Sequence, residues 1–194
     1  MTKQEKLIEI AKTYVGTKEE GGDNKGPQVE EFQRAIGKAE GEPWCVSFIQ
    51  YCVKKVDAEM GGEENKLPQT EHVMTLWRDG ANLRIEKPEA GCVMLWEHYK
   101  DGKRTGLGHA GVVTKVSKDG KTVDTVEGNT SDGSGIDRNG DGCYARQRPT
   151  VSGANSTMKV LGWMRIWDPK EELLDKIITE EEINVKLTLI GTRA

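Results

Sequence analysis

The chain has 194 residues, of which 35% are hydrophobic and 31% charged, and its formal net charge is −4. This length allows one good core, or one domain with a short appendage. The negative charge disfavours nucleic acid or an anionic membrane surface as a partner. No apolar run approaches the roughly 18 residues that a membrane span requires. The four cysteines have no metal-ligand spacing and are too few for a disulfide scaffold, so we expect free thiols.

Two short helices are predicted before the first cysteine. Apolar residues recur at helical spacing over residues 3–15, and Gly16 ends this run. A second helical run begins at Pro27, which suits the first turn of a helix, and Gly37 closes it. The segment between the two runs is polar and glycine-rich, and we expect it to be a loop.

The third predicted helix begins at Cys45 and runs for about three turns, with apolar residues at helical spacing as far as Val56. Pro43 cannot lie inside this helix, so Cys45 falls in or next to the first turn. There the unpaired N–H groups and the positive end of the helix dipole favour a thiolate and can hold an oxyanion. Cys45 is therefore a candidate nucleophile, and packing in the core is the alternative. Cys52, two turns further on the same face, is predicted to be a core residue.

Residues 69–78 are predicted to form a short helix that is capped by Thr70, with His72 on the surface. From residue 85 onward the pattern favours strands. The predicted strands are 92–96, 108–116, 121–129, 143–148 and 157–167. His98 falls in a predicted turn at 97–102, where we expect it to be solvated. The elements together predict an α+β fold in which the cysteine helix precedes an antiparallel sheet.

The composition shifts after Asp168, so we expect one domain over residues 1–168 and a helix–strand appendage of unknown role over 169–194. The segment 128–142 is rich in Gly, Ser, Asp and Asn and is predicted to be a long loop. In it, Asp137, Asn139 and Asp141 copy the first half of a calcium-binding loop. Arg148 stands where position twelve requires glutamate, which excludes an EF-hand. A looser Ca²⁺ site stays open as an alternative, and otherwise we predict no metal and no cofactor.

His109 lies on one predicted strand, and Glu127 and Asn129 lie on the next. A two-residue turn at Asp119–Gly120 pairs 118 with 121 and turns His109 away from both polar residues. A three-residue turn pairs 117 with 121 and places His109 opposite Asn129, with Glu127 opposite Gly111 on the same face. The second register assembles a thiol, a base and a polar acceptor, the three parts of cysteine-dependent acyl transfer. The alternative is a histidine that only fills a strand position.

Several segments resemble the CHAP branch of the NlpC/P60-type peptidoglycan hydrolases, a family widely found in phage endolysins and bacterial autolysins. The segments that carry the resemblance are 15–19, 24–27, 41–48, 108–113, 126–130 and 140–144 with Arg146. The resemblance implies a papain-like fold, with Cys45 as nucleophile and His109 as general base and then acid. It makes Glu127 the orienting group, with Asn129 assisting or replacing it. Trp44, next to the nucleophile, is the candidate substrate-binding residue.

The resemblance implies a hydrolase that cleaves an amide bond of peptidoglycan, as an N-acetylmuramoyl-L-alanine amidase or an endopeptidase. The amino terminus lacks a signal-peptide pattern. We therefore expect a monomeric, bacteriolytic phage endolysin that is made in the host cytoplasm and acts on the cell wall after release. Two other functions stay open. One is an amidase that acts on a soluble amide, and the other is a non-catalytic wall-binding or virion module in which Cys45 is only packed.

Overall fold

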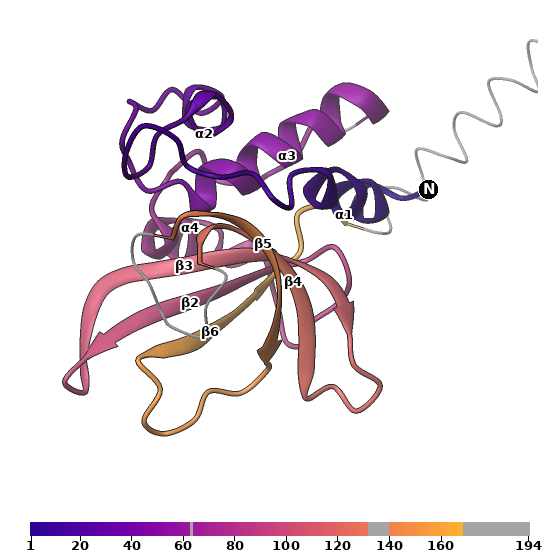
Figure 1. Cartoon of the computed structure of the whole chain (residues 1–194). Coiled ribbons are helices and arrows are strands. Elements are labelled where there is room, and N and C mark those ends of the chain that lie inside the picture. Colours follow the sequence, from indigo (N-terminus) through magenta and orange to yellow (C-terminus); the bar gives the residue numbers. More distant parts are fainter. Residues whose placement is uncertain (63, 132–139, 169–194) are drawn as a thin grey trace, which may run out of the picture.

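The computed structural model describes residues 1–62, 64–131 and 140–168. In this part of the chain, helices precede a curved antiparallel sheet (Figure 1). The helices are α1 (Lys3–Thr13), α2 (Pro27–Arg34), α3 (Cys45–Met60), α4 (Val73–Asp79) and the short 3₁₀ helix η1 (Ala81–Leu83). The strands are β1 (Arg84–Ile85), β2 (Val93–Lys100), β3 (Lys103–Val116), β4 (Thr122–Thr130), β5 (Gly142–Pro149) and β6 (Met158–Met164). The predicted appendage, 169–194, lies outside the described residues.

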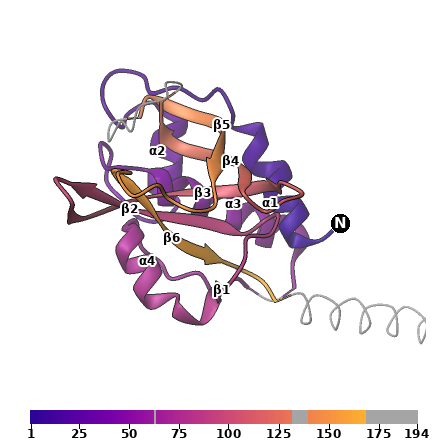
Figure 2. The same ribbon diagram turned by 90° about the horizontal axis from the view of Figure 1, so that it is seen from below.

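The sheet has the strand order β1-β6-β2-β3-β4-β5, and each neighbouring pair is antiparallel. Figure 1 shows α1, α2 and α3 together on one side of the sheet, and Figure 2 shows α4 near its β1 edge. The predicted α+β architecture, a papain-like arrangement of helices on an antiparallel sheet, is confirmed. No helix among the described residues combines the length and the apolar character needed to cross a bilayer.

Two apolar clusters cover the two faces of the sheet. The larger cluster lies between the helices and the sheet, and includes Phe48 and Val53 of α3 with Val112 and Val126 of the strands. The smaller cluster, on the opposite face, consists of Cys92, Met94, Trp96, Val113, Val123 and Trp163. Alternation along each strand sends successive side chains to opposite faces, which separates Val112 from Val113. All four cysteines are buried and free, as expected from the sequence.

The cysteine helix is longer than its apolar pattern indicated. It contains 16 residues and ends at Met60, one turn beyond Val56. The final turn carries polar residues and faces away from the core, so periodicity alone did not reveal it. Gly61, which has a φ of 65°, ends the helix.

The fourth helix begins later than expected, at Val73, and its N-cap residue is His72 rather than Thr70. Gln50 of α3 explains the difference, because its side-chain amide donates to the carbonyls of Pro68 at 2.9 Å and Thr70 at 2.7 Å. Those carbonyls are therefore held by the neighbouring helix before α4 begins. His72 is 71% exposed at its side chain, so the surface assignment was correct.

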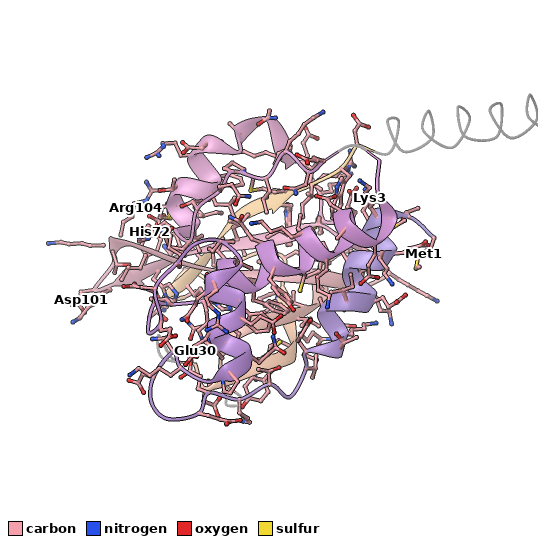
Figure 3. All side chains as sticks on the ribbon, turned by 90° about the horizontal axis from the view of Figure 1, so that it is seen from above. Met1, Lys3, Glu30, His72, Asp101 and Arg104 are labelled. Carbon is pink, nitrogen blue, oxygen red and sulfur yellow. The ribbon has the colours of Figure 1, made fainter. Side chains whose placement is uncertain are left out.

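The prediction of a turn at 97–102 was wrong for its first part, because His98 lies within β2 and pairs with Met158 of β6. The turn itself is confined to Asp101 and Gly102, which both have positive φ, and Lys100 pairs directly with Lys103. An Asp-Gly pair satisfies a tight two-residue turn, so the strands continue on either side of it. Figure 3 shows Asp101 at the tip of this hairpin, which projects from the molecule.

Gly128 allows β4 to lie directly against the start of α3. A Cβ at this position would be 2.6 Å from Cζ3 of Trp44 and 2.9 Å from Cβ of Phe48. We expect Gly128→Ala to lower the free energy of unfolding by about 1–3 kcal/mol, because the added methyl overfills this contact. Urea unfolding measures the change. Gly153→Ala is the matched control, since its Cβ meets nothing within 4 Å, and an equal loss in both variants would contradict the packing explanation.

Candidate active site

Cys45 is the first residue of α3 and is 6% exposed. The first hydrogen bond within the helix runs from the N–H of Phe48 to the carbonyl of Trp44, at 2.9 Å. The N–H groups ahead of Phe48 have no carbonyl of the helix to bind, as at the start of any α-helix. The structure therefore places the thiol beside backbone donors and the positive end of the helix dipole, where the sequence predicted it.

The ring of His109, on β3, lies between a thiol and a carboxylate. Its Nε2 is 3.0 Å from Oε2 of Glu127 on β4, and a further hydrogen bond joins the ring to the side chain of Cys45. Trp96 of β2 stacks on the ring, with centroids 5.6 Å apart and an interplanar angle of 29°. Hydrogen bonds and stacking thus hold the imidazole in one orientation, although the three neighbours come from different elements.

The hydrogen bonds also change the proton affinity of His109. Burial by itself lowers the pKa of the ring, because it disfavours the charged form. The hydrogen bonds with Cys45 and Glu127 act in the opposite direction and prevail, so the pKa rises from 6.5 to about 9. The site therefore favours a protonated imidazole at neutral pH, which is the partner that a thiolate requires.

Glu127 has no exposed surface, and its carboxylate accepts hydrogen bonds from several directions. Thr125 Oγ1 donates to Oε1 at 2.5 Å. Arg148 of β5 donates from Nε to Oε1 at 2.8 Å and from Nη2 to Oε2 at 2.5 Å. Burial raises the pKa of a carboxyl group, but Arg148 and His109 outweigh it and bring the pKa of Glu127 from 4.5 to about 2. The group that holds His109 is therefore an anion.

The register between β3 and β4 decides which acceptor reaches His109, and it changes along the hairpin. Near the turn, Val116 pairs with Val123, which is the register of the two-residue turn. A bulge between Val113 and Lys115 shifts the pairing by one residue, so that Val112 pairs with Val126. This second register places Glu127 beside Gly111, as the three-residue turn predicted. Both registers considered from the sequence are therefore present, each in its own half of the hairpin.

Gly111 leaves the space through which Glu127 approaches His109. A Cβ at Gly111 would lie 2.6 Å from Cγ of Glu127, which is closer than side-chain carbons approach one another. The glutamate side chain therefore lies over Gly111, where the strand has no side chain to obstruct it. The partner of the ring is Glu127, as the family resemblance implied, and not Asn129, which the three-residue turn placed opposite His109.

Asn129 has a different place in the site. Its backbone is left-handed, with a φ of 55°. With its amide oriented so that each end meets a complementary group, its oxygen accepts from the N–H of Trp44 and its nitrogen donates to the carbonyl of Gly140, both at 3.2 Å. Asn129 therefore ties β4 to the residue before Cys45. It positions the thiol from the backbone side rather than the imidazole.

The expectation that Trp44 binds substrate is wrong for its indole ring, which is fully buried. The ring stacks on Phe32, with centroids 5.6 Å apart, and its Nε1 donates to Oε1 of Glu19 at 2.7 Å. A side chain enclosed in this way has no surface to offer a ligand. Trp44 instead anchors the start of α3 to α2 and to the loop after α1.

Of the residues in the candidate calcium loop, Asp137 and Asn139 lie outside the described residues. Asp141 bonds to protein groups: Lys18 Nζ is 3.0 Å from its Oδ2, and the hydroxyl of Tyr144 donates to its Oδ1 at 2.8 Å. Over the described ranges 1–62, 64–131 and 140–168, no cluster of three or more His, Cys, Asp or Glu side chains could hold a metal ion. The loop site stays a prediction from sequence.

Three side chains of the site were not predicted: Thr125, Trp96 and Arg148. Thr125 lies two positions before Glu127, so strand alternation places it on the same face and could have revealed it. Arg148 had no such signal, because Arg146 lies two positions before it, on the same face of the same strand, and is an equal candidate. In the folded sheet Arg148 is paired with Val123 and Arg146 with Thr125, nearer to Glu127, so the pairing of the strands would not have selected Arg148 either.

A cysteine at the start of a helix, a histidine bonded to it and a carboxylate behind the ring, on a papain-like fold, are the parts of a cysteine hydrolase. Residues 37–129 match the family model of the CHAP domain, and CHAP domains are peptidoglycan hydrolase domains of the cysteine, NlpC/P60-like type. The match includes Cys45, His109 and Glu127, and it ends at Asn129, before β5 and β6. Searches of curated proteins and of solved structures found no match to the chain.

The four thiols differ in their surroundings, which predicts selective alkylation. Burial raises the pKa of Cys92 and of Cys143 to about 12, and also raises the pKa of Cys52. At about pH 7, we expect iodoacetamide to modify Cys45 in the native protein while the other three react only after unfolding in urea. Peptide mass spectrometry measures each site. Equal rates at all four native thiols would contradict a special environment for Cys45.

The raised pKa of His109 predicts a pH-dependent contribution to stability. A protonated ring that is favoured in the folded state stabilises the protein below the unfolded pKa of 6.5, and this contribution is lost as the pH rises through about 9. We expect the unfolding free energy of the wild type, relative to His109→Gln, to fall by up to about 3 kcal/mol over this range. Urea titrations at successive pH values measure it, and a difference independent of pH would contradict the assigned pKa.

Proposed function

We propose that this protein is a cysteine-dependent hydrolase that cleaves an amide bond of peptidoglycan through an acyl-enzyme. The observation that carries the proposal is the continuous contact from Cys45 through His109 to the buried carboxylate of Glu127. The CHAP domain supports peptidoglycan as the substrate. A packed cysteine without a function would need neither a histidine beside it nor a buried charge behind that histidine.

The tautomer of His109 follows from its partners. Glu127 is ionised and can only accept, so the Nε2 that faces it carries a proton. The other ring nitrogen, Nδ1, is then the one that exchanges a proton with Cys45. This assignment makes the imidazole a base toward the thiol and, once protonated, an acid toward the leaving group.

In the first half of the proposed reaction, His109 takes the proton of the Cys45 thiol, and the sulfur attacks the carbonyl carbon of the scissile amide. The oxygen of the tetrahedral intermediate becomes negative, and the N–H groups at the start of α3 stabilise it. When the intermediate collapses, the C–N bond breaks and His109 delivers its proton to the departing amine. The products of this half are a free amine and a thioester on Cys45.

In the second half, His109 is neutral and accepts a proton from water, which attacks the thioester carbonyl. The C–S bond of the new tetrahedral intermediate breaks, and His109 returns the proton to the sulfur. The acyl group leaves as a carboxylic acid, and the free thiol is regenerated. Water supplies the only added atoms, and His109 passes through both charge states in each cycle.

We propose further that the bond cleaved is either the N-acetylmuramoyl-L-alanine amide or a peptide bond of the stem or cross-bridge. The biological setting that fits this activity is a phage endolysin, which meets the cell wall after release from the cytoplasm where it is made. This part of the proposal is supported by the resemblance to CHAP endolysins. Since Cys45, His109 and Glu127 come from one chain, we propose that a monomer is active.

Cys45→Ala tests the nucleophile. We expect it to abolish release of soluble fragments from purified sacculi, and His109→Ala to reduce the release nearly as much, because each removes a reacting group. The control is Cys52→Ala, which shortens a buried cysteine of the same helix and should keep activity. Mass spectrometry of the released muropeptides identifies the bond, because a new L-alanine amino terminus marks an amidase. Full activity of Cys45→Ala would refute the proposal, and cleavage of soluble amides alone would replace its substrate.

A further inference from the structure

Arg148 is the partner of Glu127 farthest along the chain, and it lies beyond the segment that matches the CHAP domain. Its guanidinium meets the carboxylate with two parallel hydrogen bonds, one to each oxygen. The side chain of Arg148 is 16% exposed, and that of Glu127 is fully buried. A bidentate pair of this kind sets the plane of the carboxylate as well as its position. It is therefore a built feature of the site rather than a surface ion pair.

The reaction cycle creates a need for a permanent cation at this place. While His109 is protonated, the imidazolium balances the charge of Glu127. After the amine has left, His109 is neutral and no longer does so. Thr125 donates a hydrogen bond but carries no charge. A buried carboxylate without a cation tends to take up a proton, and a protonated Glu127 would no longer accept from Nε2 in the same way.

We propose that Arg148 is a positioning residue, which keeps Glu127 ionised and in one orientation through both charge states of His109. The expected effect on turnover rests on the proposed function, whereas the effect on the ring and the thiol does not. Arg148 touches none of the reacting groups, so it acts through Glu127 alone. A neutral amide at position 127 would avoid the cost of a buried charge. The pairing with Arg148 offsets that cost, which explains why a fully buried glutamate can orient His109.

The surroundings of Glu127 support this assignment from each side. His109 faces it from β3, Thr125 from its own strand, and Arg148 from β5. The charge of Glu127 also reaches Cys143 of β5 and contributes to the raised pKa of that thiol after the larger effect of burial. Among these groups, Arg148 alone is charged at every pH at which the enzyme could work.

Arg148 also lies near Trp96. The guanidinium carbon lies 5.7 Å from the centroid of the indole, and the same indole stacks on His109. The arginine therefore contacts both groups that hold the imidazole, the carboxylate at its edge and the indole on its face. The indole carries no charge, so its contact with Arg148 has no part in the ionisation of Glu127.

The test compares Arg148→Gln with Arg148→Lys in the full-length protein. The first readout is the rate of Cys45 alkylation by iodoacetamide as a function of pH, which needs no peptidoglycan. The second is the pH dependence of kcat and KM for the release of fragments from sacculi. Arg165→Gln is the matched control, because Arg165 forms a similar two-bond pair with Glu89 away from the site.

In Arg148→Gln, Glu127 should take up a proton at higher pH. The low-pH sides of the pH profiles for alkylation and for kcat, their acid limbs, should therefore both move upward by about one pH unit or more. We expect kcat to fall by about tenfold to a hundredfold with little change in KM, as for other residues that orient a reacting group. Lysine keeps the charge without the two-bond geometry, so Arg148→Lys should restore the acid limb and only part of kcat. Arg165→Gln should move neither limb.

Unmoved acid limbs in a folded Arg148→Gln would overturn the inference, while an inactive Cys45→Ala would still support the proposed hydrolase. If Arg148→Gln does not fold, the double variant Glu127→Gln, Arg148→Gln takes its place, since it contains no buried charge to balance. The inference expects its alkylation limb to match that of Glu127→Gln alone, because Arg148 has no other task at the ring. A limb displaced from that of Glu127→Gln would overturn it.

Discussion

A negative charge without access to water lies at the centre of this molecule, on Glu127. Burying an ion costs several kcal/mol unless partners surround it, so the carboxylate is stable only where β3, β4 and β5 bring donors to it together. Those donors are His109, Thr125 and Arg148. The pairing of the strands therefore also sets the geometry of the site. A shift of one residue in either neighbouring strand would remove one of these partners.

The thiol depends on a second set of contacts, on the helix side of β4. Gly128 lets the strand touch Trp44 and Phe48, and Asn129 accepts from the backbone N–H that precedes Cys45. Two consecutive residues of β4 therefore hold the start of α3, and the residue before them holds the histidine. The distance between nucleophile and base is fixed because one short strand segment positions both.

The sequence predicted elements with a regular period well and tertiary contacts poorly. The first three helices and the strands of the central hairpin follow from apolar spacing, and the residue types of the site follow from chemistry. The cap of α4 was missed because Gln50, distant in sequence, holds the carbonyls ahead of it. His98 was placed in a turn because an Asp-Gly pair marks a turn without giving its length. Trp44 was taken for a ligand-binding residue because sequence shows nothing of what encloses an indole.

The sequence by itself determined the order of the elements, the thiol at a helix start, and the set of residues from which a base and its acceptor could come. These depend on local spacing, which the chain carries directly. The tertiary structure alone decided that Glu127 rather than Asn129 faces the ring, since Glu127 lies over Gly111 and reaches Nε2, whereas Asn129 has a left-handed backbone and bonds to the N–H of Trp44. It also decided that Arg148 completes the charge balance, because the side chain of Arg148 reaches Glu127 from a position paired with Val123, past the position of Arg146. Such a contact joins two strands, and no single segment of the sequence contains it.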